Sequence, residues 1–145
     1  PELPFEARRQ RQMCIRDRNR ANKIMIKILY IAFGGGVGAS LRYILNESLK
    51  NHSIFSLPLG IMVVNFLGCF CIGIAMAQLA DAKDNLYLFL VVGFLGSFTT
   101  MSAFSQQTFE MLYNGKDINA LIYVLVSIGS CILGTYIAYA LFKTS

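Results

Sequence analysis

The sequence predicts an all-α membrane protein, and both its composition and its hydrophobic pattern indicate this. Hydrophobic residues make up 55% of the chain and charged residues only 14%, whereas soluble domains carry about 25% charged residues. Four apolar segments are long enough to cross a hydrocarbon core, which takes about 20 residues. They lie at residues 25–45, 57–80, 86–112 and 118–142. Short polar connections join them, and the last segment lacks the polar stripe of a soluble bundle helix.

The first 24 residues differ from the rest of the chain. They hold seven Lys/Arg and three Asp/Glu, a net charge of +4, whereas residues 25–145 carry a net charge of +1. The tail lacks the apolar stretch of a signal peptide, and its basic run is typical of a nucleic-acid or lipid patch. Because "RRQRQMCIRDR" also resembles translated adapter sequence, we predict that residues 1–24 are a non-native or disordered tail. Residues 25–145 then form the four-helix transmembrane domain.

The first span contains a cluster of glycines at residues 34–39, "GGGVGA". These letters fit a loose dinucleotide fingerprint, which also needs a βαβ unit and an acidic residue about 20 positions on. No Asp or Glu occurs between Glu47 and Asp81. The spacing of Gly34 and Gly38 is instead that of a small-x-x-x-small pair, which lets helices approach closely in lipid. We therefore predict a helix-packing face.

Arg42 lies at the end of the first span. One interpretation is an interfacial anchor whose aliphatic stem lies along apolar surface. The other is a charge near a pore or a dimer interface, because ionisable residues at membrane depth usually face protein or water. The sequence leaves both roles open.

The second span holds one strongly polar side chain in its apolar centre, Asn65. An amide facing lipid is costly, so Asn65 must point into a helix interface or a pore. A hydrogen bond between helices and a pore role are both open. The cysteines Cys69, Cys71 and Cys131 lie in spans at a spacing that matches no zinc or iron–sulfur arrangement. We expect them to be small apolar packing residues.

The third span predicts a broken helix. Two glycines precede a run of hydroxyl side chains that can satisfy backbone groups where a membrane helix is interrupted. These are Gly93 and Gly96, followed by Ser97, Thr99, Thr100, Ser102 and Ser105. A broken helix presents carbonyls to a cation and N–H groups to an anion.

Met101 and Phe104 are three residues apart and so share one helical face. Aromatic edges are electropositive. A small anion can therefore be passed along such a face, with the Asn65 amide and Ser/Thr hydroxyls replacing its water.

The positive charges give no clear orientation in the membrane. Counted from Met25, one side holds Lys27, Lys83 and Lys143, and the other holds Arg42, Lys50 and Lys116. Because an excess of Lys/Arg sets orientation, this tie predicts insertion in both directions. Two opposed copies then form an antiparallel homodimer with two-fold symmetry. The tail would change the count to ten against three, so this prediction depends on the tail being foreign.

Three motifs, in order, resemble those of the fluoride channel family called Fluc or CrcB, across nearly the whole chain from Met25. "GGGVGASLRY" is similar to its first-helix motif G-G-x-x-G-A-x-x-R-Y, and "VNFLGCFCIG" to V-N-x-x-G-x-x-x-x-G. "GFLGSFTTMSAFS" is similar to G-F-x-G-x-x-T-T-F-S-T-F-S. The resemblance implies an antiparallel dual-topology homodimer in the plasma membrane of a prokaryote. It further implies passive fluoride export that lowers fluoride toxicity, and a structural Na+ at the dimer centre.

The resemblance also implies roles for single residues. The implied fluoride pore includes Asn65, Phe104, Met101, Ser102 and Thr100. Further pore-lining hydroxyls are expected in the fourth span at Tyr123, Ser127 and Ser130. Arg42 corresponds to the family's first-helix arginine. The central Na+ is implied to lie against the backbone carbonyls of Gly96 and Thr99 from each subunit.

Three positions depart from the family pattern. Met101 replaces the first of two ring-edge phenylalanines, Ala103 replaces a threonine, and Gln107 stands where an acidic residue is usual. Methionine is adaptable but has no ring quadrupole. We therefore expect the pore site at position 101 to differ, while the fold stands.

Two other functions are compatible with parts of this pattern. A small proton-coupled multidrug exporter would need an intramembrane carboxylate, but the first span has none and Glu110 lies near the end of the third. A non-conducting scaffold protein would explain the glycines but not Asn65. No carboxylate pair or nucleophile–base pair indicates an enzyme, and we expect His52 to be a solvated loop residue. The expected partners are fluoride, a second copy and lipid, without nucleic acid.

Overall fold

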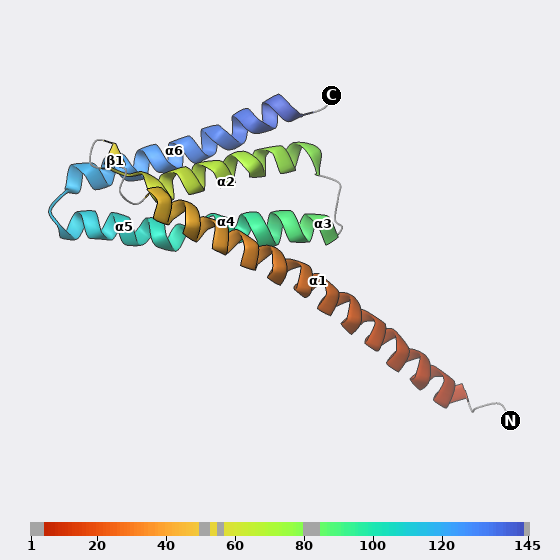
Figure 1. Cartoon of the computed structure of the whole chain (residues 1–145). Helices are drawn as coiled ribbons and strands as arrows, with labels where there is room; N and C mark the ends of the chain where they lie inside the picture. Colours follow the sequence, from red (N-terminus) through yellow and green to blue (C-terminus); the bar gives the residue numbers. More distant parts are fainter. Residues whose placement is uncertain (1–4, 50–52, 55–56, 80–84, 144–145) are drawn as a thin grey trace.

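The structure is a computed structural model that describes residues 5–49, 53–54, 57–79 and 85–143. The first half of these residues forms α1 (Phe5–Leu49), β1 (Ser53–Ile54), β2 (Leu57–Pro58) and α2 (Leu59–Gln78). The second half forms α3 (Asn85–Tyr87), the π-helix η1 (Leu88–Leu95), α4 (Gly96–Phe98), α5 (Met101–Tyr113) and α6 (Asp117–Phe142) (Figure 1). Four stretches are long and apolar enough to cross a membrane: Gln12–Leu49, Leu59–Gln78, Asn85–Tyr113 and Asp117–Phe142. The prediction of four spans is thus confirmed.

The first helix begins earlier than the sequence indicated. We predicted a span from residue 25 after a non-native or disordered tail, but α1 begins at Phe5 and continues without interruption to Leu49. The physical reason is the absence of glycine and proline between Phe5 and Gly34, because Ala, Arg, Gln, Met and Lys all favour helix. This part of α1 extends away from the other helices (Figure 1). Whether it is native stays a prediction.

A chain that begins at Met25 is expected to keep the stability and transport activity of the full chain. The side chains of residues 12–24 are all exposed, so their removal uncovers no packed surface. The two chains are compared by their apparent melting midpoints in detergent and by their transport activity in liposomes. A clear fall in either after removal of residues 1–24 would show that the tail belongs to the working protein.

The connection between the first two spans contains a short β-ribbon, which an all-α prediction does not include. Ser53 pairs with Pro58 and Ile54 with Leu57 in antiparallel register. Pro58 has no backbone N–H and its fixed φ suits the start of a helix, so α2 begins at Leu59 rather than at residue 57. The predictions for Lys50, His52 and Lys83 lie outside the described residues.

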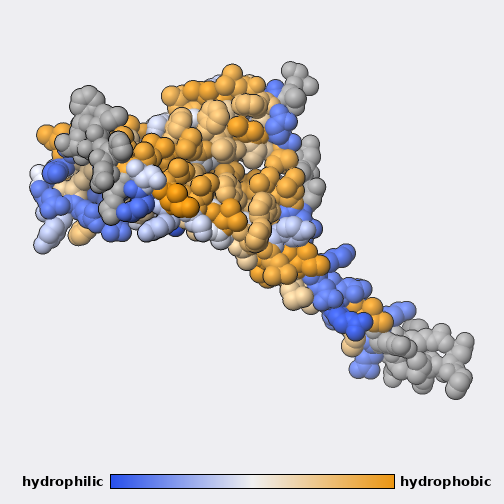
Figure 2. All heavy atoms as spheres, viewed as in Figure 1, coloured by the Kyte–Doolittle hydropathy of each residue, from blue (hydrophilic) through white to orange (hydrophobic). Residues whose placement is uncertain are grey.

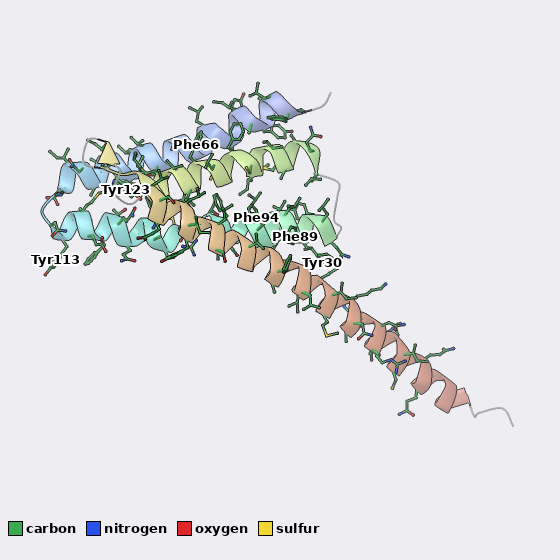
Figure 3. All side chains as sticks on the ribbon, viewed as in Figure 1. Tyr30, Phe66, Phe89, Phe94, Tyr113 and Tyr123 are labelled. Atoms are coloured by element: carbon green, nitrogen blue, oxygen red, sulfur yellow. The ribbon has the colours of Figure 1, made fainter. Side chains whose placement is uncertain are left out.

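The glycine cluster of α1 forms a helix-packing face, as predicted, and it packs against the third span. A Cβ added to Gly34 would collide with the carbonyl oxygen of Phe89, and one added to Gly38 with that of Phe94. Phe89 and Phe94 lie where η1 runs beside α1 (Figure 3). Only glycine allows this approach of the two backbones, so the packing-face interpretation is confirmed.

Replacing Gly38 by alanine is expected to destabilise the fold by about 1–3 kcal/mol, the range for overpacking, because the obstructing atom is backbone. Gly36→Ala is the matched control on the same helix, since a Cβ there meets nothing within 4 Å. Alanine in place of a helical glycine should stabilise by roughly 0.5–1 kcal/mol. Thermal unfolding in detergent compares the two variants. Equal melting midpoints would contradict the close approach.

The second and fourth spans form the other packed pair. Gly73 lies against the Thr135 carbonyl of α6, and the Thr135 hydroxyl donates to the carbonyl of Cys69 on α2 over 2.9 Å. Figure 1 shows α2 and α6 side by side along most of their length. Together these contacts hold α2 and α6 in a fixed register beside the third span.

The outer surface of the helices is largely apolar. Figure 2 shows orange side chains over the middle of the four-helix body and blue ones at its ends and along the N-terminal part of α1. Large side chains such as Phe33, Leu125 and Ile132 are exposed. A soluble protein rarely shows so much contiguous apolar surface, whereas a hydrocarbon environment favours it.

Candidate functional site

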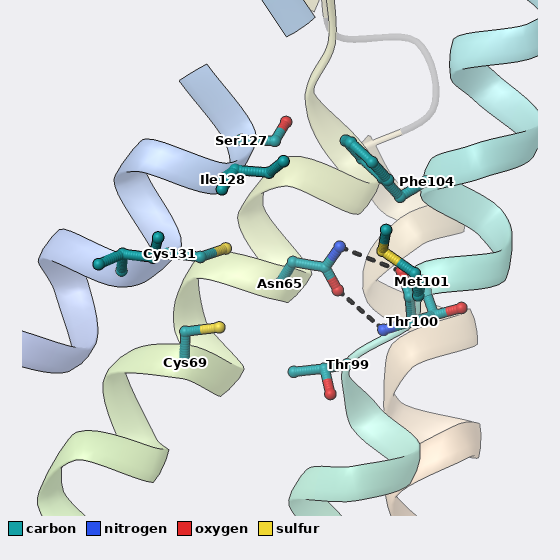
Figure 4. A pocket seen from close by; sticks show the side chains of 10 residues that line it. Asn65, Cys69, Thr99, Thr100, Met101, Phe104, Ser127, Ile128 and Cys131 are labelled. Atoms are coloured by element: carbon teal, nitrogen blue, oxygen red, sulfur yellow. Dashed lines mark hydrogen bonds between the residues drawn. The ribbon is translucent and has the colours of Figure 1, made fainter. Parts of the chain in front are cut away.

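A pocket of about 260 Å³ lies between α2, α6 and the segment that joins α4 to α5. Its walls are formed by Asn65, Cys69, Thr99, Thr100, Met101, Phe104, Ser127, Ile128, Cys131 and Ile132 (Figure 4). None of these residues is Asp, Glu, Lys, Arg or His. The pocket therefore offers neutral hydrogen-bonding groups within apolar walls.

Two residues of the third span leave the helical conformation at this pocket. Thr99 has φ −74° and ψ 148°, and Thr100 has φ −144° and ψ 118°. The Thr99 hydroxyl donates to the carbonyl of Leu95 over 3.0 Å. The Thr100 hydroxyl accepts from the N–H of Ala103 over 3.3 Å and so caps α5. Threonine side chains thus satisfy backbone groups on both sides of the extended residues.

The side chain of Asn65 joins α2 to this extended segment. Its amide oxygen accepts from the Thr100 N–H over 2.8 Å, and its Nδ2 donates to the Thr100 carbonyl over 3.2 Å (Figure 4). One amide therefore satisfies both backbone groups of a residue that has no helical partners. An NH₂ group carries two hydrogens, so one donor of Asn65 remains for the pocket.

Phe104 forms the wall of the pocket at the start of α5. It is buried and stacks on Tyr123 of α6, with ring centroids 5.2 Å apart and an interplanar angle of 22°. The Tyr123 hydroxyl donates to Oε1 of Gln107 over 2.7 Å. The ring of Phe104 is thus held in place from the side of α6.

Met101 and Phe104 line the same pocket but differ in exposure. Met101 is 69% exposed and Phe104 only 7%. Both belong to α5, where the three-residue spacing puts them on one side. The structure therefore brings them together as the sequence indicated, with Met101 at the outer edge.

Ser127 is the least satisfied polar group at the pocket. Its side chain is 4% exposed, and its Oγ is buried without a hydrogen-bond partner among the described residues. Buried hydroxyls are nearly always paired. An unpaired hydroxyl in the wall of a pocket is suited to a bound water or ion.

Other predicted residues lie near the pocket but outside its walls. The Ser102 hydroxyl is 3.1 Å from that of Thr100, and Ser130 donates to the Ser127 carbonyl over 3.0 Å. Arg42 is half-buried, and its Nε donates to the Ser97 carbonyl over 3.3 Å. Arg42 thereby satisfies a carbonyl at the C-terminal end of α4, where helix carbonyls lack partners.

The carbonyls around the extended segment differ in their partners. Those of Leu95 and Ser97 accept from Thr99 and Arg42. Within the described residues, no side chain from another helix donates to the carbonyls of Gly96 or Thr99. Hard oxygen ligands of this kind suit a cation such as Na+, so the residues fit the implied ligand set.

The sequence did not indicate that Cys69 and Cys131 would line the pocket. We expected small packing residues, because neither lies in a metal-binding spacing. A helical period relates Cys69 to Asn65 and Cys131 to Ser127, each pair four residues apart. This spacing could have indicated that the cysteines line the pocket, but only if it had been known which sides of α2 and α6 face each other.

Comparison with known proteins finds a matching family and many similar sequences. The family described as CrcB-like protein, Camphor Resistance (CrcB), matches residues 29–139. A protein from Geobacter sulfurreducens is 40% identical over 115 residues, which cover 77% of this chain and 93% of the relative. One from Shewanella halifaxensis is 34% identical over 119 residues, 81% of this chain and 96% of the relative. Both carry the name fluoride-specific ion channel FluC.

Proposed function

The chain belongs to the CrcB-like protein family, and from that premise we propose that it is a fluoride-selective channel. It exports fluoride passively from the cytoplasm of a prokaryote and so lowers fluoride toxicity. Its four apolar helices make it a multi-pass membrane protein. The single observation that supports the proposal best is the buried, unpaired hydroxyl of Ser127 in the wall of the Asn65 pocket.

The chemistry of the pocket matches that of a small, strongly hydrated anion. Such an ion enters a low-dielectric path only where fixed groups replace its water. The free N–H of Asn65 and the Ser127 hydroxyl are neutral donors, and the Phe104 ring adds an electropositive edge. A fixed cation would hold an anion tightly, whereas neutral donors let it leave again. Chloride is larger, and donors that converge on a small anion would leave too narrow a passage for it.

The extended Thr99–Thr100 segment is proposed to be the functional break of the third span. The carbonyls of Gly96 and Thr99 would hold a structural Na+ together with the same carbonyls of a second copy, because two oxygens are too few for a hard cation. A bound Na+ would supply positive charge between the carbonyl groups of the two copies. Arg42 keeps α4 in place through the Ser97 carbonyl.

A second copy in the opposite orientation completes this arrangement. The charge count from Met25 supports insertion in both directions if residues 1–24 are foreign, and a two-fold axis would then bring the third spans of the two copies together. We propose an antiparallel dual-topology homodimer on this basis. Cross-linking between two single-cysteine variants, with the cysteines at opposite ends of the third span, would detect the opposed copies.

Anion efflux from liposomes tests the proposal directly. Liposomes that contain the full chain are loaded with fluoride or chloride, and a selective electrode follows efflux after the membrane potential is collapsed. We expect rapid loss of fluoride and retention of chloride. Retention of both anions by well-folded protein would contradict a fluoride channel, and loss of both would contradict its selectivity.

The alternative of a proton-coupled exporter finds little support in the structure. Such a protein needs a carboxylate in its transport path. Glu110 is exposed on α5, accepts from Gln106 over 2.9 Å and does not line the pocket. Fluoride efflux that is unchanged by a proton gradient would separate the channel from the exporter.

Ser127→Ala is expected to slow fluoride efflux about tenfold or more without loss of stability. Removal of an unpaired buried hydroxyl relieves a desolvation cost of about 1–3 kcal/mol, so the melting midpoint should stay equal or rise. Ser130→Ala is the matched control on α6, because its hydroxyl bonds to its own helix and lies outside the pocket. Equal efflux from both variants would remove Ser127 from the path.

A further inference from the structure

Two cysteine side chains meet at the pocket wall opposite the extended segment. Cys69 comes from α2 and Cys131 from α6, and both thiols are free. Both residues line the same pocket. Figure 4 shows both sulfur atoms directed toward the pocket. The function proposed above uses neither of them.

Hydrogen bonds hold the backbones of the two cysteines close to each other. The Thr135 hydroxyl lies 2.9 Å from the carbonyl of Cys69 and 3.0 Å from that of Cys131. One hydroxyl therefore joins the two cysteine residues across the helix pair. The contact of Gly73 with the Thr135 carbonyl fixes the same register one turn farther along α2. The thiol pair is thus set by rigid helix packing and not by a loop.

From this geometry, we propose that Cys69 and Cys131 form a dithiol site that binds one thiophilic d¹⁰ metal ion in two-coordinate fashion. Ions of this class include Hg²⁺, Ag⁺ and Cu⁺, because soft thiolate ligands select soft metals. Binding breaks two S–H bonds, forms two S–metal bonds and releases two protons. No electron transfer is involved.

The number of ligands determines the class of metal. No group of three or more His, Cys, Asp or Glu side chains that could hold a metal occurs among the described residues. Zinc in structural sites takes four ligands, so this pair does not suit it. Two thiolates alone satisfy an ion that prefers two ligands.

Occupation of this site would act on transport. Cys69 and Asn65 are four residues apart on α2, and Cys131 and Ser127 are four apart on α6, all in one pocket. A metal ion between the thiols therefore stands beside the proposed anion donors and narrows the space around them. This effect rests on the proposed function, whereas the binding of the metal does not.

The test uses the full chain with Cys14 and Cys71 replaced by serine, because these exposed thiols would bind metal independently. The purified protein is treated with HgCl₂ and washed with excess glutathione, and the retained mercury is measured by intact-protein mass spectrometry. We expect one Hg²⁺ per chain with loss of both remaining free thiols. Further replacement of Cys69 or Cys131 by serine, or in a second set by alanine, should abolish retention.

The outcomes separate the metal site from the channel. Mercury retained after either cysteine is replaced, or washed out when both are present, would overturn the dithiol site. In liposomes, Hg²⁺ should lower fluoride efflux to the rate of protein-free vesicles only when both cysteines are present. Retained mercury with unchanged efflux would overturn the effect on transport. Protein that binds mercury but never transports fluoride would instead contradict the proposed function.

Discussion

Phe104→Ile is expected to abolish fluoride efflux while the four-helix fold is retained. Phe104 is buried in the pocket wall, and its ring lies 5.2 Å from that of Tyr123. Isoleucine keeps most of the apolar contact but removes the electropositive ring edge that replaces water around the anion. The lost stacking is worth only about 0.5–1.5 kcal/mol, too little to unfold the protein. Fluoride efflux from liposomes measures the effect.

Phe109→Ile is the matched control for this substitution. Phe109 belongs to the same helix and stacks on Tyr113 with ring centroids 6.2 Å apart, but it does not line the pocket. Its replacement removes a similar ring pair and should leave efflux unchanged. Equal losses from the two variants would indicate a general packing effect and would remove Phe104 from the pore.

The four spans were predictable because each is a long apolar segment bounded by polar turns. Length and hydropathy decide whether a helix can cross a membrane, and neither depends on tertiary contacts. The start of α1 was not predicted. The charged composition of residues 1–24 suggested a boundary before the first span, but no glycine or proline there ends the helix. The β-ribbon was missed because two-residue strands leave no periodic signal.

The pocket was partly predictable from residue types. Asn65, Thr100, Met101 and Phe104 were chosen because polar or aromatic groups in the interior of a span indicate a helix interface or a path. The pairing of Asn65 with the backbone of Thr100 was not predictable, since it depends on the register between α2 and the third span. The places of Ser127, Cys69 and Cys131 in the walls likewise depend on how α6 faces α2.

Asn65→Leu is expected to abolish fluoride efflux and to lower the melting midpoint. It removes both hydrogen bonds to Thr100 and leaves a backbone N–H and a carbonyl unpaired, at about 1–3 kcal/mol for each. Gln78→Leu is the matched control on α2, because Gln78 also donates from its amide to a backbone carbonyl, that of Phe142, outside the pocket. That variant should keep both its efflux and its melting midpoint.

Asn65→Asp separates the two roles of the amide. Aspartate keeps the acceptor for the Thr100 N–H but has no donor for an anion, and its negative charge repels fluoride. We expect efflux to be lost as fully as in Asn65→Leu although the bond from the Thr100 N–H is kept; the melting midpoint should fall as well, because the carboxylate oxygen that replaces Nδ2 faces the Thr100 carbonyl. If the loss of efflux in each of the two variants were instead proportional to its fall in melting midpoint, Asn65 would act only by joining α2 to the extended segment. Because the amide touches both the backbone and the pocket, only a variant that keeps the first contact while it changes the second can assign a pore role.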